Sequence, residues 1–171
     1  MNGLKNPSEG GSTFLPYLLL LLFVLLNSMP SNVKALAQIE LGLYFIPLFF
    51  IGLTAESDAT PVFVALFGFL NDILSEMPLG FWSSLFVVFY LLCVSQRAII
   101  STGSFGSYWI TFGVLIMMTY LAAYLLAALS DDLHLTIIPF VLSCFICILF
   151  FPVIYFPLYF FSDALTGAER N

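Results

Sequence analysis

Long apolar runs separated by short polar segments organise the whole chain. With its flanks, each run approaches the roughly 20 residues that a helix needs to cross a bilayer. The runs do not alternate with a period of two residues, as the strands of a membrane barrel would. Because a backbone inside hydrocarbon must satisfy its own amides, the runs predict α-helices. We place six spans at 14–33, 36–54, 61–77, 81–96, 108–129 and 133–161.

Residues that start or stop helices mark several boundaries. Thr60 before Pro61 predicts a helix start with the threonine hydroxyl as its cap. The sequence Pro-Leu-Gly at 78–80 predicts a tight turn between two helices. Pro152 and Pro157 are expected to kink the last helix or to end it early.

Composition excludes an ordinary soluble domain. Of the 171 residues, 61% are hydrophobic and 8% are charged, whereas soluble domains carry about 25% charged residues. The expected organisation is a short cytoplasmic tail (1–13), a six-helix transmembrane domain (14–162) and a second short cytoplasmic tail (163–171). A cleaved signal peptide is the alternative for the first run, but polar residues separate that run from the small residues at 35–37.

The few charged residues predict the orientation. The net charge is −6 and basic residues do not cluster, which excludes a nucleic-acid partner and a polybasic lipid-binding patch. With six spans, one side of the membrane holds Lys5, Arg97 and Arg170 in tails or loops. The other side holds only Lys34, so both termini are expected in the cytoplasm. Trp82 is expected at the outer interface.

An acidic residue inside the third run is the most informative feature. Asp72 lies about six residues before Pro78, or roughly 9 Å along a helix, near or within the hydrocarbon edge. Small or polar residues share or flank its helix face: Ala65, Gly68, Asn71 and Ser75 or Glu76. Because lipid chains solvate a carboxylate poorly, this face is expected to point toward protein.

Three roles are open for this face. It packs and hydrogen-bonds within the bundle, with Asp72 capped by Asn71, Ser75 or another neighbour; it contacts a partner or a ligand; or it performs catalysis or relays protons. Packing is favoured, because no basic side chain is expected in mid-membrane to pair with Asp72. A hydrolase would also need a nucleophile with a base beside it. We therefore expect no catalytic residue and a chain that is not an enzyme.

No cofactor or metal is expected. Cys144 and Cys147 form C-x-x-C inside an apolar run, where they are expected to be small packed side chains. Asp131, Asp132 and His134 carry metal-ligand chemistry, but a solvated helix cap is the favoured interpretation. The sequence has no phosphate-binding loop, no H-E-x-x-H and no dinucleotide fingerprint.

The segment from 68 to 80 reads Gly-x-x-x-Asp, then small or polar residues, then Pro-Leu-Gly at the start of the next apolar run. This segment, the chain size, the short tails and the six expected spans resemble the MreD family of rod shape-determining membrane proteins. The matching positions are Gly68, Asp72, Pro78, Leu79 and Gly80. The resemblance implies a fold similar to the six-helix substrate-capture subunits of energy-coupling-factor vitamin transporters.

The resemblance also implies a non-enzymatic component of the bacterial cell-elongation machinery in the inner membrane. Such proteins bind MreC, and through it they connect to MreB filaments and to the glycosyltransferase and transpeptidase that build lateral peptidoglycan. The expected partner-binding or helix-packing residues are Gly68, Asn71, Asp72, Ser75, Pro78, Leu79 and Gly80. The alternative function is a small-molecule, vitamin-type binding subunit of a transporter, which needs convergent polar groups in an outward cavity.

Overall fold

A computed structural model describes residues 10–27, 42–55, 57–75, 78–100, 105–128 and 137–167. Within these ranges the regular structure is all helical, with six helices and no strand. The helices are α1 (Gly10–Asn27), α2 (Phe45–Thr54), α3 (Thr60–Leu74), α4 (Phe81–Ile100), α5 (Phe105–Ala128) and α6 (Ile137–Gly167). The expectation of an all-α chain is confirmed for the described residues.

Helix length distinguishes α5 from the other helices. Among the described residues, one segment is both long and apolar enough to cross a membrane, and it is Phe105–Leu126 in α5. The apolar parts of the remaining helices are shorter, between 10 and 17 residues. Length and composition alone therefore identify one candidate span, where the sequence led us to expect six.

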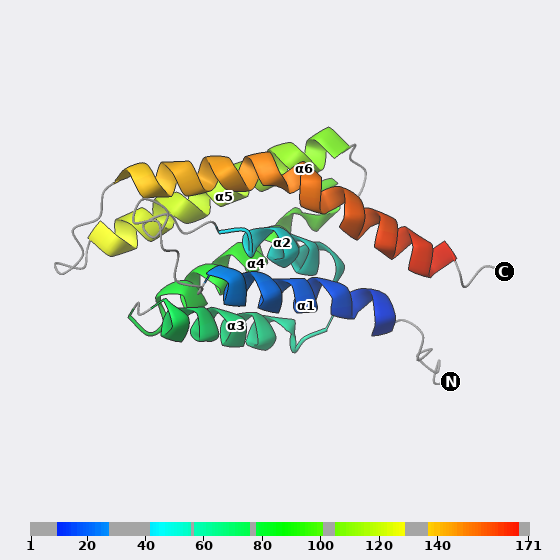
Figure 1. Ribbon diagram of the computed structural model, residues 1–171, viewed down its shortest axis with the longest axis horizontal. Helices are drawn as coiled ribbons and strands as arrows, with labels where there is room; N and C mark the ends of the chain where they lie inside the picture. Colours follow the sequence, from blue (N-terminus) through cyan, green and yellow to red (C-terminus); the bar gives the residue numbers. More distant parts are fainter. Residues whose placement is uncertain are drawn as a thin grey trace.

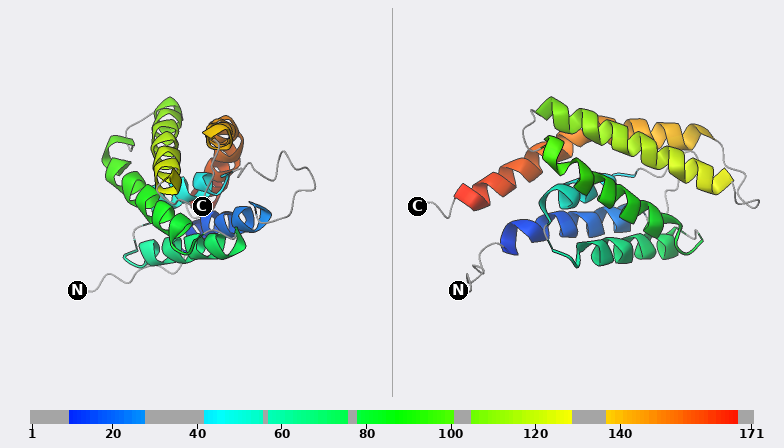
Figure 2. Two further views of the ribbon diagram at one scale, coloured as in Figure 1. Left: turned by 90° about the vertical axis from the view of Figure 1, so that its left-hand side faces the viewer. Right: turned by 180° about the vertical axis from the view of Figure 1, so that it is seen from behind.

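The helices form three tiers (Figures 1 and 2). α5 and α6 lie side by side on one side, α1 and α3 lie on the other, and α2 and α4 fill the middle. Phe112 stacks on Phe151 at 4.5 Å between ring centroids, and Phe105 stacks on Phe156 at 5.5 Å, so α5 and α6 are antiparallel. The first turn of α1 and the last turn of α6 lie at the same end of the molecule.

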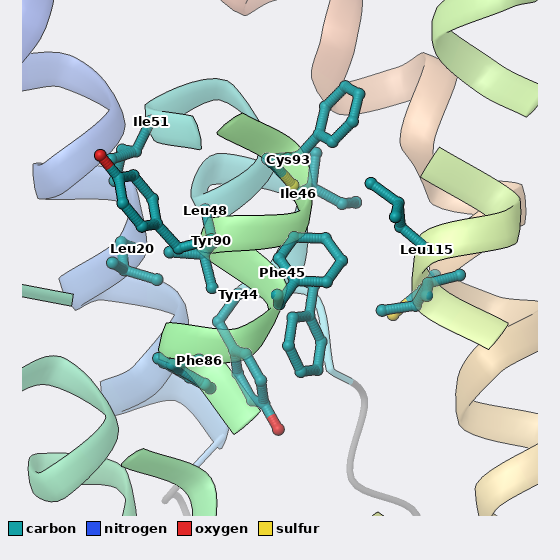
Figure 3. Close-up of a cluster of buried hydrophobic side chains, with 14 of the residues drawn as sticks. Leu20, Tyr44, Phe45, Ile46, Leu48, Ile51, Phe86, Tyr90, Cys93 and Leu115 are labelled. Atoms are coloured by element: carbon teal, nitrogen blue, oxygen red, sulfur yellow. The ribbon is translucent and has the colours of Figure 1, made fainter. Parts of the chain in front are cut away.

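The short helix α2 is the centre of the core. It packs against α1, α4 and α6, and Figure 3 shows its side chains between those of α1, α4 and α5. Phe45 lies 4.9 Å from Phe89 between ring centroids, and Gly52 lies against Cys93 further along both helices, so α2 and α4 are parallel. Most of α2 is buried: Phe45, Ile46, Pro47, Leu48, Phe49, Ile51 and Gly52.

The second helix begins later than the apolar run predicts. A span over 36–54 was expected, but residues 42–44 form a turn and the helix starts at Phe45. Gly42 has φ +57, a conformation that favours glycine, and an added Cβ would overlap the Tyr120 hydroxyl. The ten residues of α2 therefore reach about 15 Å, half of a typical hydrocarbon core. Residues 36–41 lie outside the described ranges.

The start of α3 also differs from the expectation. Thr60 was expected to be the cap, but Ala59 takes that position without a side-chain cap hydrogen bond. The Ala59 N–H instead bonds the Ser57 hydroxyl oxygen at 3.3 Å. The Thr60 hydroxyl is buried and accepts a hydrogen bond from the Tyr17 hydroxyl of α1 at 3.4 Å. At its other end the helix stops at Leu74, short of the predicted residue 77.

The last helix continues through both of its prolines. An early end at Pro152 or Pro157 was one expectation, yet α6 reaches Gly167, and it bends along its length as prolines cause (Figure 1). Proline has no N–H, so Pro152 leaves the Ile148 carbonyl without its helical donor. The indole N–H of Trp109 on α5 donates to that carbonyl at 3.0 Å. A side chain of α5 thus replaces the backbone bond that the proline removes.

The remaining boundaries move by a few residues. α1 begins at Gly10, and residues 28–33 of the first predicted span lie outside the described ranges. α4 continues to Ile100, beyond the predicted residue 96, and α5 begins at Phe105, ahead of residue 108.

Candidate functional site

The carboxylate of Asp72 caps the N-terminus of α4. Its side chain is 0% exposed, and Oδ1 accepts a hydrogen bond from the Trp82 N–H at 2.6 Å. Oδ2 accepts from the N–H groups of Gly80 and Ser83 at 2.9 and 3.3 Å. The first N–H groups of a helix lack partners within the helix, and the helix dipole favours an anion there. An acidic residue near the end of α3 thus satisfies the start of α4.

The turn between the two helices explains why the cap comes from a distant residue. The Gly80 carbonyl accepts the first α4 hydrogen bond, from Ser84 at 3.0 Å, which is the N-cap position. Glycine offers no capping side chain, and its φ of +98 disfavours the residues that would. The Pro78 carbonyl accepts from the Phe81 N–H at 3.1 Å, so the predicted tight turn is confirmed.

Gly68 brings the two helix backbones into direct contact. A Cβ added there would lie 2.5 Å from the Cα of Ser83 and 2.9 Å from its nitrogen. The Ser83 hydroxyl donates to the Ala65 carbonyl of α3 at 2.9 Å. The two helices form an antiparallel hairpin. Ala65 of α3 contacts Ser83 of α4, and Asp72, later on α3, contacts Gly80, which precedes α4. The small residues of α3 therefore face α4 of the same chain.

Asn71 has no role in this cap. Its side chain is 0% exposed, and neither the amide oxygen nor the amide nitrogen has a hydrogen-bond partner in the described part of the chain. Of the expected partners of Asp72, Asn71 and Ser75 are therefore wrong, and other neighbours, the N–H groups at the start of α4, take that role. Ser75 ends α3, where its N–H donates to the Asn71 carbonyl at 2.9 Å. Asn71 is left as a buried polar group with an unmet requirement for partners.

Trp82 lies in the core. Its ring, which was expected at the outer interface, packs against protein: it is 2% exposed and lies 5.9 Å from the ring of Tyr44 and 5.3 Å from that of Phe81. Its backbone N–H makes the shortest of the three bonds to Asp72. Burial of the ring therefore also fixes the amide that the carboxylate binds.

Apart from Asn71 and Ser75, the predicted site residues divide into two groups. The structure brings together Gly68, Asp72 and Gly80, and the expectation that Asp72 faces protein is confirmed. Pro78 and Leu79 are exposed at the end of the hairpin. The sequence-based list omitted Trp82 and Ser83, which donate through backbone N–H groups. A glycine immediately before a long apolar helix is the signal that indicates a missing cap.

A second charged residue caps the opposite end of another helix. Arg97 was expected in a loop, but it lies in the last turn of α4. Its Nε donates to the Gly52 carbonyl at 2.6 Å, and its Nη2 donates to the Ala55 carbonyl. A cation at a helix C-terminus is favoured by the dipole. Arg97 therefore fixes the end of α2, as Asp72 fixes the start of α4.

Replacing Arg97 by methionine is expected to lower the free energy of unfolding by about 1–2 kcal/mol, because two C-terminal carbonyls lose a charged donor. Arg97→Lys should recover only part of this loss, because an ammonium lacks the fork that reaches both carbonyls. The melting temperature in detergent measures the effect, with Ser95→Ala, an exposed neighbour, as the control. Equal melting temperatures for Arg97→Met and Ser95→Ala would contradict the capping role of Arg97.

Other candidate chemistry is sparse in the described ranges. Cys93 and Cys147 are buried and Cys144 is half-buried, and none of the three forms a disulfide. Among the residues that the structure describes, no three metal-ligating side chains gather at one place. The segment 131–134, which carries Asp131, Asp132 and His134, lies outside these ranges. The hairpin is thus the best-defined candidate site.

Comparison of the chain with protein-family models, with curated proteins and with solved structures found no match.

Proposed function

We propose that the chain is a multi-pass membrane protein. The supporting observation is that large apolar side chains point outward on five helices, including Leu18 on α1, Leu66 on α3, Leu91 on α4, Ile110 on α5 and Val141 on α6. Soluble monomers rarely expose extended apolar surface, because it drives association in water. Hydrocarbon would solvate these side chains on every side of the bundle.

Six crossings agree with the directions of the helices. α3 and α4 are antiparallel, α5 and α6 are antiparallel, and α2 and α4 are parallel, as in a chain that reverses after each helix. The first turn of α1 and the last turn of α6 lie at one end. This arrangement supports an even number of crossings. The distribution of basic residues supports a bacterial inner-membrane protein with that end in the cytoplasm.

Thiol labelling of the two ends of α3 tests this orientation. Ser57 precedes α3 and Leu79 follows it, and both are exposed. In intact cells, a membrane-impermeant maleimide should label Leu79→Cys and leave Ser57→Cys unlabelled until the membrane is permeabilised. The parent chain, with its three native cysteines, is the control. Labelling of Ser57→Cys, and not of Leu79→Cys, from the outside would show that the orientation is the reverse of the proposed one.

Within that membrane, the chain acts as a non-enzymatic scaffold of the bacterial cell-elongation complex. One observation carries this step: the Asp72 carboxylate is fully buried and bonded to three backbone N–H groups. Its acceptor oxygens hold two helices together, which is an architectural role. Arg97 is engaged in the same way by carbonyls. The motif at 68–80, which resembles that of the MreD family, therefore supports an anchor better than a site for chemistry.

The proposed partners are an MreC-like membrane protein and, through it, MreB filaments and the elongation-specific transpeptidase and glycosyltransferase. Because the small residues of α3 are covered by α4, the partner binds elsewhere than at Gly68 and Asp72. Affinity purification of the tagged chain from its own membranes should recover the MreC-like protein. Depletion of the chain should turn rod-shaped cells round. Normal rods together with no recovery of that partner would contradict the proposed function.

A further inference from the structure

The helices of the bundle differ in length on its two sides. α3 has 15 residues and α5 has 24, so the helices extend about 22 Å and about 36 Å. A typical hydrocarbon core is about 30 Å thick. α5 is therefore long enough to cross it, whereas α3, in the opposite tier, is too short by several ångströms (Figure 1).

The outer face of α3 is a short apolar stripe that follows polar residues and stops before a tight turn. Large side chains at helical spacing point away from the bundle: Val62, Leu66, Phe69 and Ile73. The exposed polar residues Ser57 and Asp58 precede the helix, and the turn at 78–80 follows it. Neither flank carries Lys or Arg, whose long side chains reach from within hydrocarbon to the interface. The bounds of the helix, Thr60–Leu74, therefore set the bilayer thickness that this face matches.

We propose that the outer face of α3 contacts a bilayer that is locally thinned, so that the protein joins a thin region of lipid on the α3 side to lipid of ordinary thickness on the α5 side. The inference rests on the proposed membrane location. A helix shorter than the hydrocarbon core is accommodated by bilayer thinning, by snorkelling flanks or by association. The flanks lack snorkelling residues.

Association through this face is disfavoured by the shape of its residues. Helix interfaces in membranes are enriched in small residues that let backbones approach. On α3 the small residues Ala65 and Gly68 lie against α4, and the outer stripe consists of branched and aromatic side chains. The acyl chains of lipids are therefore the occupant that the stripe fits.

Nitroxide labels at matched positions test the proposal. Val62 and Ile73 on α3 are 61% and 55% exposed, and Ile110 and Leu121 on α5 are 68% and 59% exposed. Both pairs have the same sequence separation, about 17 Å along a helix. Each position is changed to cysteine in a chain whose native cysteines are replaced by alanine. The labelled chains are reconstituted in vesicles of dioleoyl phosphatidylcholine.

Collision with a water-soluble nickel chelate and with oxygen then measures the depth of each label. Both α3 labels should be shallower than both α5 labels, with collision rates to the nickel chelate several-fold higher. Equal depths for the two pairs would overturn the proposal, because the lipid would have its ordinary thickness at α3. Exclusion of both reagents from the α3 labels would also overturn it, because protein would cover the stripe. Water exposure of the α5 labels would instead contradict the membrane location itself.

Discussion

Replacing Asp72 by alanine is expected to lower the free energy of unfolding by about 3–5 kcal/mol, because the N–H groups at the start of α4 lose a charged acceptor in a buried site. The nearest of these, the Trp82 N–H, lies 2.6 Å from the carboxylate, beneath a ring that is 2% exposed. Water reaches this amide poorly once the carboxylate is gone. Denaturant titration in mixed micelles measures the loss.

Asn71 provides the matched control for Asp72. The two side chains are adjacent in the sequence and equally buried, but the Asn71 amide has no hydrogen-bond partner among the described residues. Asn71→Leu should therefore leave the free energy of unfolding unchanged or raise it, because an unsatisfied polar group is removed from the core. If Asp72→Ala and Asn71→Leu change the free energy of unfolding by the same amount, the carboxylate does not hold the α3–α4 hairpin together.

Replacing Gly68 by alanine is expected to cost about 3 kcal/mol, the upper end for an overpacked position. The added Cβ would lie 2.5 Å from the Cα of Ser83, and a backbone atom has no rotamer by which to move away. Alanine is otherwise favoured over glycine in a helix by about 1 kcal/mol. The collision must therefore outweigh a gain in helix propensity.

Gly113 provides the comparison for this substitution. It also lies inside a helix, but an added Cβ there would meet only the Cδ1 of Ile148, at 3.9 Å. Gly113→Ala should raise the melting temperature, whereas Gly68→Ala should lower it. The same substitution therefore has opposite effects on stability at the two sites. A rise in melting temperature for both variants would contradict the close contact between α3 and α4.

The features that sequence predicted correctly depend on local patterns. The all-helical class follows from the apolar runs, and the turn follows from Pro78 and Gly80. The inward direction of Asp72 follows from the cost of exposing a carboxylate to lipid, together with the small residues on the same helix face. Each of these conclusions uses residues within one turn or one run of the chain.

Gly80 indicates that α4 lacks its own cap, but the partners of Asp72 were missed because one backbone N–H group cannot be told from another in the sequence. Every residue except proline carries the same donor, so only the folded hairpin shows which three the carboxylate meets. Arg97 was missed for the same reason, since its acceptors are the carbonyls at Gly52 and Ala55. Predictions that pair side chains of opposite charge do not consider the backbone N–H and carbonyl groups at helix ends, which also bind charged side chains.

Tertiary contacts also moved two helix boundaries. The stretch from Leu41 to Leu53 has no polar break apart from the tyrosine hydroxyl, yet the Tyr120 hydroxyl occupies the space beside Gly42 and the helix starts later. In α6 an early end was one of two expectations, and Pro152 does remove the helical donor of the Ile148 carbonyl. Trp109 supplies that donor from α5, so the helix continues.

The distance between the carboxyl carbon of Asp72 and the amide nitrogen of Trp82 tests the central claim most directly. Carbon–nitrogen dipolar recoupling by solid-state NMR, on the full chain in lipid with these two sites labelled, measures it. The Oδ1 to N separation of 2.6 Å predicts strong dephasing between the labelled atoms, and Asp72→Asn should shift the Trp82 amide resonance. No measurable coupling, with the Trp82 amide resonance unchanged in Asp72→Asn, would contradict an acidic cap that closes the α3–α4 hairpin.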